Sequence, residues 1–244
     1  MHTPSKQPPE VSIVLPCLNE VETLPACIRQ IQRTLRRHRI RGEIIVADNR
    51  SSDGTGMVAK HMGVRVVRVP KRGYGYAIQD GAKRAAAPLI IIGDPDGSYD
   101  FSHIPQFLTA LRKGYDVVIG NRFRRHIRSN AMSWPHRFGN QLLTSIGNLL
   151  FHTPFHDHHC GIRGFSKAAL CRMQIRSAHF EFDPEMAIKA TLLGMRAKEI
   201  PVILWPDKRT RHHSYIRIVR DGLQNLVMML HCWHDRNCLR SAAC

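Results

Sequence analysis

Two aspartates separated by one proline follow an apolar run in the stretch "LIIIGDPDGSYD", residues 89–100. In an extended chain, residues i and i+2 point to the same face, so Asp94 and Asp96 are expected to lie side by side. Pro95 has no N–H group, so the strand is predicted to end there. Two neighbouring carboxylates repel each other unless a cation lies between them. The pair therefore indicates a cation site, with a turn capped by aspartates as the alternative.

Two further acidic residues stand where predicted strands end. Glu20 follows the first predicted strand, and Asp48 comes directly after the second. In open parallel sheets, ligands collect outside the carboxyl ends of the strands. Glu20, Asp48 and the Asp94–Asp96 pair are thus predicted to converge on one ligand site, although a carboxylate such as Glu20 is also favoured in the first turn of a helix.

The elements that would position these carboxylates alternate between strands and helices. Apolar, β-branched runs predict strands over 11–15, 43–47, 64–69, 89–93 and 116–120. Helices are predicted between them, over 20–38, 53–62, 74–87 and 102–113. This alternation favours an α/β fold whose mostly parallel sheet is covered by helices on both faces.

Beyond residue 120 the regular alternation ends. We expect helices over 138–151 and 184–194, followed by a strand over 198–204. No repeat or low-complexity linker divides the 244 residues. The predicted organisation is a disordered segment over 1–10, one folded domain over 11–214, and a C-terminal amphipathic helix and tail over 215–244.

The charge of the chain limits its partners. A formal net charge of +17 indicates an anionic partner, which could be nucleic acid, an acidic membrane surface or a phosphorylated substrate. Aromatic interleaving and the named nucleic-acid recognition motifs are missing from the sequence, so nucleic acid is the least favoured of the three. The seven cysteines form no CxxC pair, which favours a reducing, cytoplasmic setting. No run approaches the roughly 18 apolar residues of a membrane span, so we expect a soluble or peripheral protein.

Neither common nucleotide-binding glycine motif follows the first predicted strand. The segment "PCLNEVET" contains no glycine, which excludes both the dinucleotide fingerprint and the P-loop at this position. Gly73 and Gly75 lie at the entrance of a later predicted helix. Their amides could approach a phosphate, or the two glycines could serve the turn alone.

Taken together, the motifs resemble those of the family 2 glycosyltransferases. The segments "SIVLPCLNE", "IIVADNRSSDGT", "RGYGYAIQDGAKRA", "IIIGDPDGSYD" and "DVVIGNRF" occur in the order and spacing of that family. The likeness continues through "DHHCGIRGFSKAAL", "FEFDPEMAIKATLLGMRAKEIPV" and "RTRHHSYIRIVRDG", and is greatest to the dolichyl- or polyprenyl-phosphate sugar synthases.

This resemblance implies a GT-A-type fold and a specific reaction. The expected activity is inverting transfer of a hexose from a nucleotide-sugar to a polyprenyl (dolichyl-type) phosphate at the cytoplasmic face of a membrane. One alternative is a soluble enzyme of the same family with a non-lipid acceptor. A basic nucleic-acid-binding module is the less favoured alternative.

The resemblance also implies roles for particular residues. Asp94 and Asp96 would hold Mg²⁺ or Mn²⁺ against the donor diphosphate, a role that suits hard oxygen ligands. The implied donor-binding residues are Pro16, Asn19, Glu20, Asp48, Gly73, Asp94 and Pro95. Asp53, which also falls in the second motif, is better interpreted as a helix cap.

On the acceptor side, the resemblance implies that Arg122, Arg209 and Ser214 engage phosphate. Asp157 matches an aspartate close to the acceptor, where it would orient groups, because a phosphate is already ionised at neutral pH. The lysine that usually follows the serine is replaced by Tyr215. A histidine-rich cluster surrounds Asp157 without the spacing of a standard zinc motif, and its role stays open. The cluster comprises His152, His156, His158, His159 and Cys160.

Two predicted helices carry apolar stripes. The first stripe contains Phe138, Leu142, Ile146 and Leu149. The second contains Ile216, Val219, Leu223, Leu226, Leu230 and Trp233, with Arg217 and Arg220 beside it. Such stripes fit either packing against the core or binding at a lipid interface. The high positive charge favours an anionic leaflet, reached by the chain alone or through a membrane-anchoring subunit.

Overall fold

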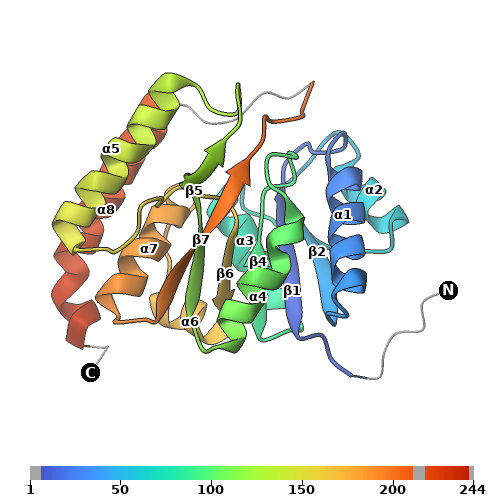
Figure 1. Cartoon of the computed structure of the whole chain (residues 1–244), viewed down its shortest axis with the longest axis horizontal. Helices are drawn as coiled ribbons and strands as arrows, with labels where there is room; N and C mark the ends of the chain where they lie inside the picture. Colours follow the sequence, from blue (N-terminus) through green and yellow to red (C-terminus); the bar gives the residue numbers. More distant parts are fainter. Residues whose placement is uncertain (1–6, 211–217, 242–244) are drawn as a thin grey trace.

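A computed structural model describes residues 7–210 and 218–241 of the chain. Seven strands form one sheet in the order β3-β2-β1-β4-β6-β5-β7 (Figure 1). Their bounds are β1 Val11–Cys17, β2 Gly42–Asp48, β3 Arg65–Arg68, β4 Leu89–Ile92, β5 Val117–Ile127, β6 Arg163–Ser166 and β7 Ala197–Leu204. Only β6 runs against its neighbours among these strands, since β4 and β5 both pair with it antiparallel. The predicted, mostly parallel sheet is confirmed.

Eight α-helices and one short 3₁₀ helix are present in the described part of the chain. They are α1 Leu24–Arg37, α2 Thr55–His61, α3 Tyr74–Arg84, the 3₁₀ helix Phe101–His103, α4 Ile104–Arg112, α5 Trp134–Phe151, α6 Lys167–Met173, α7 Phe182–Leu192 and α8 Ile218–Ser241. Compared with the predictions, α1 begins four residues later than position 20 and α5 four residues earlier than position 138. None of the described helices combines the length and apolar character required to cross a bilayer.

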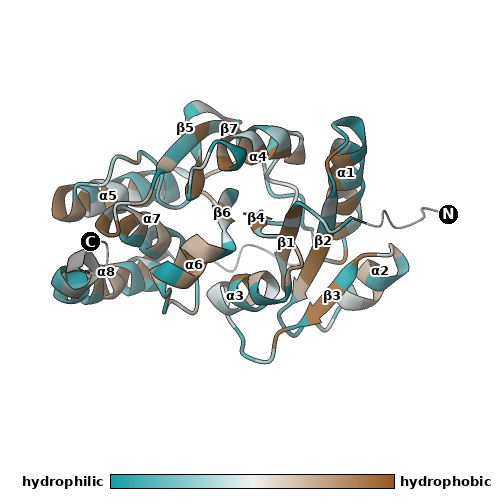
Figure 2. Cartoon of the chain, turned by 90° about the horizontal axis from the view of Figure 1, so that it is seen from below, coloured by the Kyte–Doolittle hydropathy of each residue, from teal (hydrophilic) through white to brown (hydrophobic). Residues whose placement is uncertain are grey.

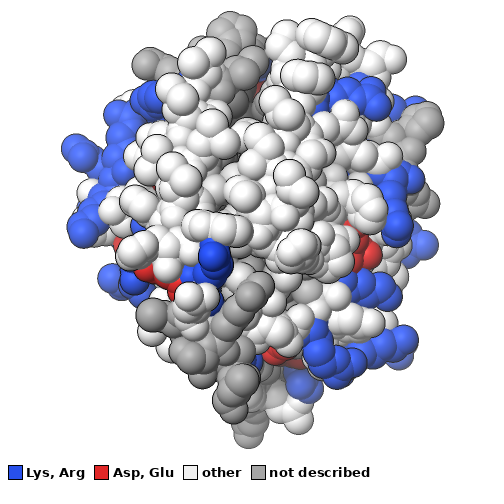
Figure 3. Space-filling model, turned by 90° about the vertical axis from the view of Figure 1, so that its left-hand side faces the viewer, with Lys and Arg blue, Asp and Glu red and all other residues white. Residues whose placement is uncertain are grey.

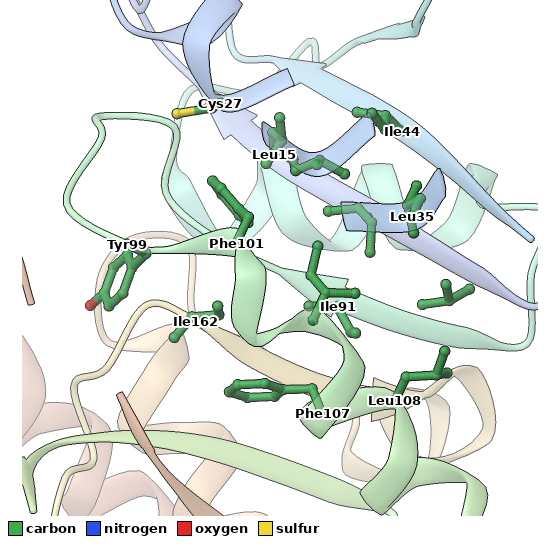
Figure 4. Close-up of a cluster of buried hydrophobic side chains, with 14 of the residues drawn as sticks. Leu15, Cys27, Leu35, Ile44, Ile91, Tyr99, Phe101, Phe107, Leu108 and Ile162 are labelled. Atoms are coloured by element: carbon green, nitrogen blue, oxygen red, sulfur yellow. The ribbon is translucent and has the colours of Figure 1, made fainter. Parts of the chain in front are cut away.

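Successive residues of the central strands face two separate cores. Ile13 and Leu15 of β1 pack with α1 and α4, whereas Val14 between them packs with α3, α6 and α7 on the other face. Figure 2 shows these two helical layers on either side of the sheet. Figure 4 shows the first core, where Phe107 and Leu108 of α4 lie near Ile91 of β4. The alternation follows from the two-residue repeat of a strand.

Helices α5 and α8 lie outside this arrangement, beyond α7 (Figure 1). They pack on α7 through a third apolar cluster that includes Phe151, Ile188, Met229 and Cys232. The ring of Phe151 meets that of Trp233 edge-on, with centroids 6.0 Å apart. The two helices therefore cover one end of the molecule rather than a face of the sheet.

Strand β6 and helix α6 were not predicted. β6 contains Arg163, whose side chain is fully buried. Its guanidinium donates to the carbonyl oxygens of Cys160 and Asp183, both at 2.8 Å, and forms an ion pair with the Asp183 carboxylate at 3.1 Å. Next to it, Gly164 lies against Leu111. A Cβ added at Gly164 would lie only 3.1 Å from the Leu111 Cδ1 atom. A charged residue and a glycine thus occupy a central strand because specific partners surround them.

Candidate active site

Two chambers open at the carboxyl end of the parallel strands and meet at Asp94 and Asp96. The larger chamber has a volume of about 480 Å³, and its wall includes Pro16, Glu20, Asn49, Gly73 and Pro95. The smaller chamber has a volume of about 250 Å³, and its wall includes Arg122, His136, Asn140, His159, Asp183, Asp221 and Asn225. Tyr74, Asp94, Asp96, Phe180 and Arg209 border both. A molecule in one chamber would therefore touch a molecule in the other at the carboxylate pair.

The two aspartates follow β4 and are partly buried. Burial raises the pKa of Asp94 well above its ordinary value, and the charges of Asp96 and Asp183 raise it further. Burial also raises the pKa of Asp96, although its carboxylate accepts hydrogen bonds from the Ser98 N–H at 2.9 Å and the Ser98 hydroxyl at 2.6 Å. Burial thus disfavours the charged form of both carboxylates.

The surroundings of Asp94 fit a divalent cation. A Cβ at Gly161 would lie 2.1 Å from Asp94 Oδ2, so the missing side chain leaves the space in which this carboxylate sits. Carboxylate oxygens suit hard cations such as Mg²⁺ and Mn²⁺. Across the described ranges, no group of three or more His, Cys, Asp or Glu side chains is arranged to hold a metal ion. Asp94 and Asp96 would therefore share a cation with oxygen atoms from a bound substrate.

Arg209 lies at the junction of the chambers. Its Nη1 donates to Glu20 Oε1 at 3.0 Å, its Nη2 lies 3.7 Å from Asp96 Oδ2, and its Nε donates to Asp207 at 3.0 Å. Burial raises the pKa of Glu20 to about 7, against the opposing effect of the Arg209 charge. Arg209 was predicted on the acceptor side, and the structure places its guanidinium at the junction, where it contacts Glu20 and Asp96 and borders both chambers.

Arg122 is fixed by a buried ion pair with Asp157. Asp157 is fully buried, and its carboxylate accepts from Arg122 Nε and Nη2, both at 2.7 Å, and from the Arg122 backbone N–H at 3.0 Å. Burial alone would raise the pKa of Asp157, but the charge and hydrogen bonds of Arg122 bring it below its ordinary value. Among the described residues, Arg122 lines the smaller chamber and Asp157 lines neither. Asp157 thus holds the Arg122 guanidinium in place, and its predicted orienting role near the acceptor stays a prediction.

At the end of β2 the structure brings Asn49 into the larger chamber and leaves Asp48 outside it. Asp48 Oδ1 accepts from the Ser51 N–H at 3.0 Å, and its Oδ2 would lie 2.8 Å from a Cβ at Gly56. Asp48 thus holds the loop after β2, and its predicted donor-binding role stays a prediction. The sequence reasoning missed Asn49, although it directly follows Asp48.

Asn19 also holds the loop after β2. Its N–H donates to the Ser51 hydroxyl at 3.0 Å, and its Oδ1 accepts from the Ser52 N–H at 2.8 Å. Asn19 lines neither chamber among the described residues, so the structure does not place it in direct contact with a donor there. Asp53 accepts from the N–H of Thr55, the first residue of α2, at 2.9 Å, but the N-cap position is Gly54, so Asp53 supports the turn before the helix rather than capping it.

Gly73, which precedes α3, and Gly75, the second residue of that helix, serve close packing. The Gly73 N–H donates to Asn49 Oδ1 at 2.7 Å, and the Gly75 N–H donates to the Ala178 carbonyl at 2.9 Å. A Cβ at Gly73 or Gly75 would lie 2.3 Å from the carbonyl oxygen of Ala178 or Ser177, respectively. Both amides are thus bound to protein acceptors, while Gly73 still forms part of the wall of the larger chamber.

The histidine cluster divides into separate environments. At the surface, His156 Nδ1 lies 2.9 Å from Glu199 Oε2. Burial lowers the pKa of His158 to about 3, so its ring is neutral, and its Nε2 lies 2.7 Å from the Thr153 hydroxyl. His159 borders the smaller chamber, and burial lowers its pKa well below the ordinary value. Ser214 and Tyr215 lie outside the described residues.

Asp183 is an acidic residue of the smaller chamber that the sequence reasoning missed. It begins the buried helix α7 and pairs with Arg163. Burial raises its pKa to about 6, while the charges of Arg163 and Arg122 oppose the rise. Its signal in the sequence was weak, because "FEFDPEM" also contains Glu181 and Glu185, and acidic residues at a helix start are favoured by the helix dipole in any case.

Comparison with known families identifies the class of enzyme. Residues 12–173 match the model of the family described as "Glycosyl transferase family 2". The chain belongs to this glycosyltransferase family. The predicted family and fold are confirmed, and the chain is a glycosyltransferase.

Individual relatives and structures agree with this membership. The low-salt glycan biosynthesis hexosyltransferase Agl6 of Haloferax volcanii is 34% identical over 224 residues, which cover 91% of this chain and 53% of Agl6. The chain thus spans about half the length of that relative. A dolichyl-phosphate hexose transferase of the same organism is 25% identical over 193 residues, 79% of this chain and 82% of that protein. Glucosyl-3-phosphoglycerate synthase of Mycobacterium tuberculosis has the same fold, with a TM-score of 0.71 at 18% identity, over 91% of this chain and 79% of the synthase.

Proposed function

We propose that this glycosyltransferase moves a hexose, with inversion, from a nucleotide-sugar to a polyprenyl phosphate at a membrane surface. The observation that carries the proposal is the meeting of two chambers at Asp94 and Asp96, one of them facing the fixed guanidinium of Arg122. A donor in one chamber and a phosphate acceptor in the other would meet at the carboxylates. A single in-line displacement there inverts the anomeric carbon.

The larger chamber is the proposed donor site. Its volume and its polar wall near Asn49 suit a nucleotide, and Pro16, Glu20, Gly73 and Pro95 line it as the family resemblance implied. Asp94 and Asp96 would hold Mg²⁺ or Mn²⁺, which when bound supplies a Lewis acid for the departing diphosphate. The mycobacterial synthase of the same fold has been solved with Mn²⁺ and UDP-glucose, which supports this donor chemistry.

The smaller chamber is the proposed acceptor site. Arg122 presents its guanidinium there, and Arg209 contributes a second cation at the junction. Guanidinium groups bind phosphate oxygens in pairs of hydrogen bonds. A phosphate acceptor is ionised at neutral pH, so no side chain has to remove its proton. Asp157, buried in its ion pair, would keep Arg122 in position during this step.

Two candidate acceptors differ in their lipid tail. The dolichyl-phosphate hexose transferase among the relatives supports a lipid phosphate. The polar residues Asn140, Asp221 and Asn225 in the wall of the smaller chamber would also suit a small phosphorylated acceptor. The mycobacterial synthase was solved with phosphoglyceric acid, an acceptor-sized molecule of that kind.

The test is a transfer assay with purified protein, Mn²⁺ and a panel of nucleotide-sugars. The acceptors are a polyprenyl phosphate in detergent, a short water-soluble prenyl phosphate, and 3-phosphoglycerate. Asp96→Asn should abolish transfer and Mn²⁺-dependent nucleotide binding, whereas Arg122→Lys should reduce transfer about 10- to 100-fold and keep nucleotide binding. Arg112→Lys, at an exposed ion pair with Glu10, is the matched control and should leave both unchanged. Transfer to 3-phosphoglycerate alone would refute the lipid acceptor.

A further inference from the structure

The outward sides of α5 and α8 leave an unusual amount of apolar surface in contact with water. Of the twelve large hydrophobic side chains exposed in the described ranges, ten lie on these two helices. They are Trp134, Phe138, Leu142 and Leu149 on α5, and Val219, Leu223, Leu226, Val227, Leu230 and Trp233 on α8. We call this set the outer apolar face. Monomeric proteins rarely expose contiguous apolar patches of this kind without a binding role.

The inward sides of the same helices are partly polar. Asn140 and Thr144 of α5, and Asp221 and Asn225 of α8, are all at most 7% exposed. A surface helix normally turns its apolar stripe to the core and its polar side to water. The N-terminal halves of α5 and α8 do the reverse, because Asn140, Asp221 and Asn225 line the smaller chamber. The apolar residues of these turns are therefore left on the outside.

The charges around the face indicate what covers it. Figure 3 shows this side of the molecule uncharged at its centre, with Lys and Arg side chains toward the edges. Arg137 of α5 and Arg220 of α8 are exposed on the helices themselves. Asp221 is buried and lies 3.5 Å from Arg220 Nε, and Asp235 pairs with Arg176, so each acidic residue of α8 offsets one arginine, against a net charge of +17 for the chain. A second copy of the chain would oppose one basic rim to another, whereas an anionic surface complements it.

We propose that the outer apolar face docks onto an anionic lipid bilayer, with α5 and α8 lying in the interface. Apolar and aromatic residues would enter the boundary between headgroups and acyl chains, and the rim would bind anionic headgroups. The docking deepens the proposed function, because the same two helices wall the acceptor chamber with their inner sides. A lipid phosphate would then reach Arg122 from the surface on which the enzyme sits.

The experiment measures partition of the full chain onto vesicles. We would compare phosphatidylcholine vesicles with vesicles that contain about one third phosphatidylglycerol, at low and high salt. The test variant is the pair Leu142→Gln and Leu230→Gln, at positions 48% and 66% exposed. The control is Met57→Gln on α2, at the opposite end of the molecule and 63% exposed (Figure 1). All these side chains face water, so the thermal transitions should coincide.

Docking predicts strong binding to the anionic vesicles, weaker binding at high salt, and at least a tenfold loss of partition in the double variant but not in Met57→Gln. The double variant should also keep transfer to a water-soluble prenyl phosphate while losing transfer to vesicle-bound polyprenyl phosphate. Equal recovery of the wild type with and without vesicles would overturn the proposal, as would unchanged binding of the double variant. A dimer that the double variant dissociates, without vesicle binding, would also overturn it and assign the face to a second copy.

These outcomes separate docking from the proposed function. If the wild type binds anionic vesicles through this face but transfers sugar to no prenyl phosphate, the lipid acceptor is wrong and the docking surface stands. If transfer to the soluble prenyl phosphate occurs without vesicle binding, the docking surface is wrong and the proposed acceptor stands.

Discussion

The buried ion pair between Arg122 and Asp157 can be tested against an exposed ion pair with similar side-chain geometry. Asp157→Asn removes the charge that faces a guanidinium with a side chain 6% exposed. Loss of one partner of such a pair costs about 3–5 kcal/mol, because the other charge stays buried and uncompensated. The Arg112–Glu10 pair has the same two-bond geometry, Nε–Oε1 at 2.6 Å and Nη2–Oε2 at 2.8 Å, but Arg112 is half-exposed. Glu10→Gln should therefore cost less than about 1 kcal/mol.

The assay is equilibrium unfolding in urea at several pH values, followed by far-UV circular dichroism. Because the folded-state pKa of Asp157 lies below its ordinary value, its contribution to stability is present above about pH 4 and disappears as the pH falls through the folded pKa. The gap between wild type and Asp157→Asn should thus be constant from pH 5 to 8 and shrink below pH 4. A gap no larger than that of Glu10→Gln at pH 7 would refute the argument.

The same variant tests the positioning role of Asp157. Since the described structure places Asp157 in neither chamber, its substitution should act only through the orientation of Arg122. The KM for the acceptor should rise, and nucleotide affinity measured by calorimetry should stay within about twofold of wild type. Loss of nucleotide affinity would instead indicate general damage to the carboxylate site.

Two further predictions concern the carboxylates at the junction. Gly161→Ala places a Cβ 2.1 Å from Asp94 Oδ2, so calorimetry should show at least a tenfold loss of Mn²⁺-dependent nucleotide binding. The control is Gly139→Ala, which has open space around the added Cβ and should show no loss of nucleotide binding. The second substitution is Glu20→Gln, measured in EDTA. Because burial raises the Glu20 pKa to about 7, ionisation of Glu20 opposes folding, and the variant should become more stable relative to wild type as the pH rises from about 4.5 to 7. A difference in unfolding free energy that does not change with pH would contradict this.

Much of the fold could be predicted because its strands carry strong local signals. The continuous apolar runs of β1, β2 and β4 predicted buried parallel strands, and the structure confirms them. β6 gave no such signal, since its Arg163 is charged and its Gly164 is small. Its stability as a strand depends on partners such as Asp183, twenty residues away in sequence, which periodicity does not reveal.

The candidate site could be predicted in outline, but side-chain direction could not. The rule that ligands collect at strand ends predicted that Glu20 and the Asp94–Asp96 pair lie together, and the structure places all three in the wall of the larger chamber. At the end of β2 the same rule left two neighbours to choose from, and the structure turns Asn49 rather than Asp48 into the chamber. Adjacent residues point to different sides, so an error of one position exchanges a ligand-facing residue for one that holds a loop. The position of Arg209 between the two chambers could not be predicted, because its ion pair with Glu20 joins residues 189 positions apart.

For α5 and α8, the sequence showed the apolar stripe but not the side to which it turns. Phe138, Leu142 and Leu149 have the spacing expected for packing against a core and equally for a lipid interface. The opposite side of the helix settles the direction, because Asn140 needs polar surroundings and finds them at the smaller chamber. An amide buried against the apolar cluster around Met229 would lose its hydrogen bonds, at a cost of about 1–3 kcal/mol. The polar residues of α5 and α8 face the smaller chamber, so this chamber and the outer apolar face occupy opposite sides of the same two helices.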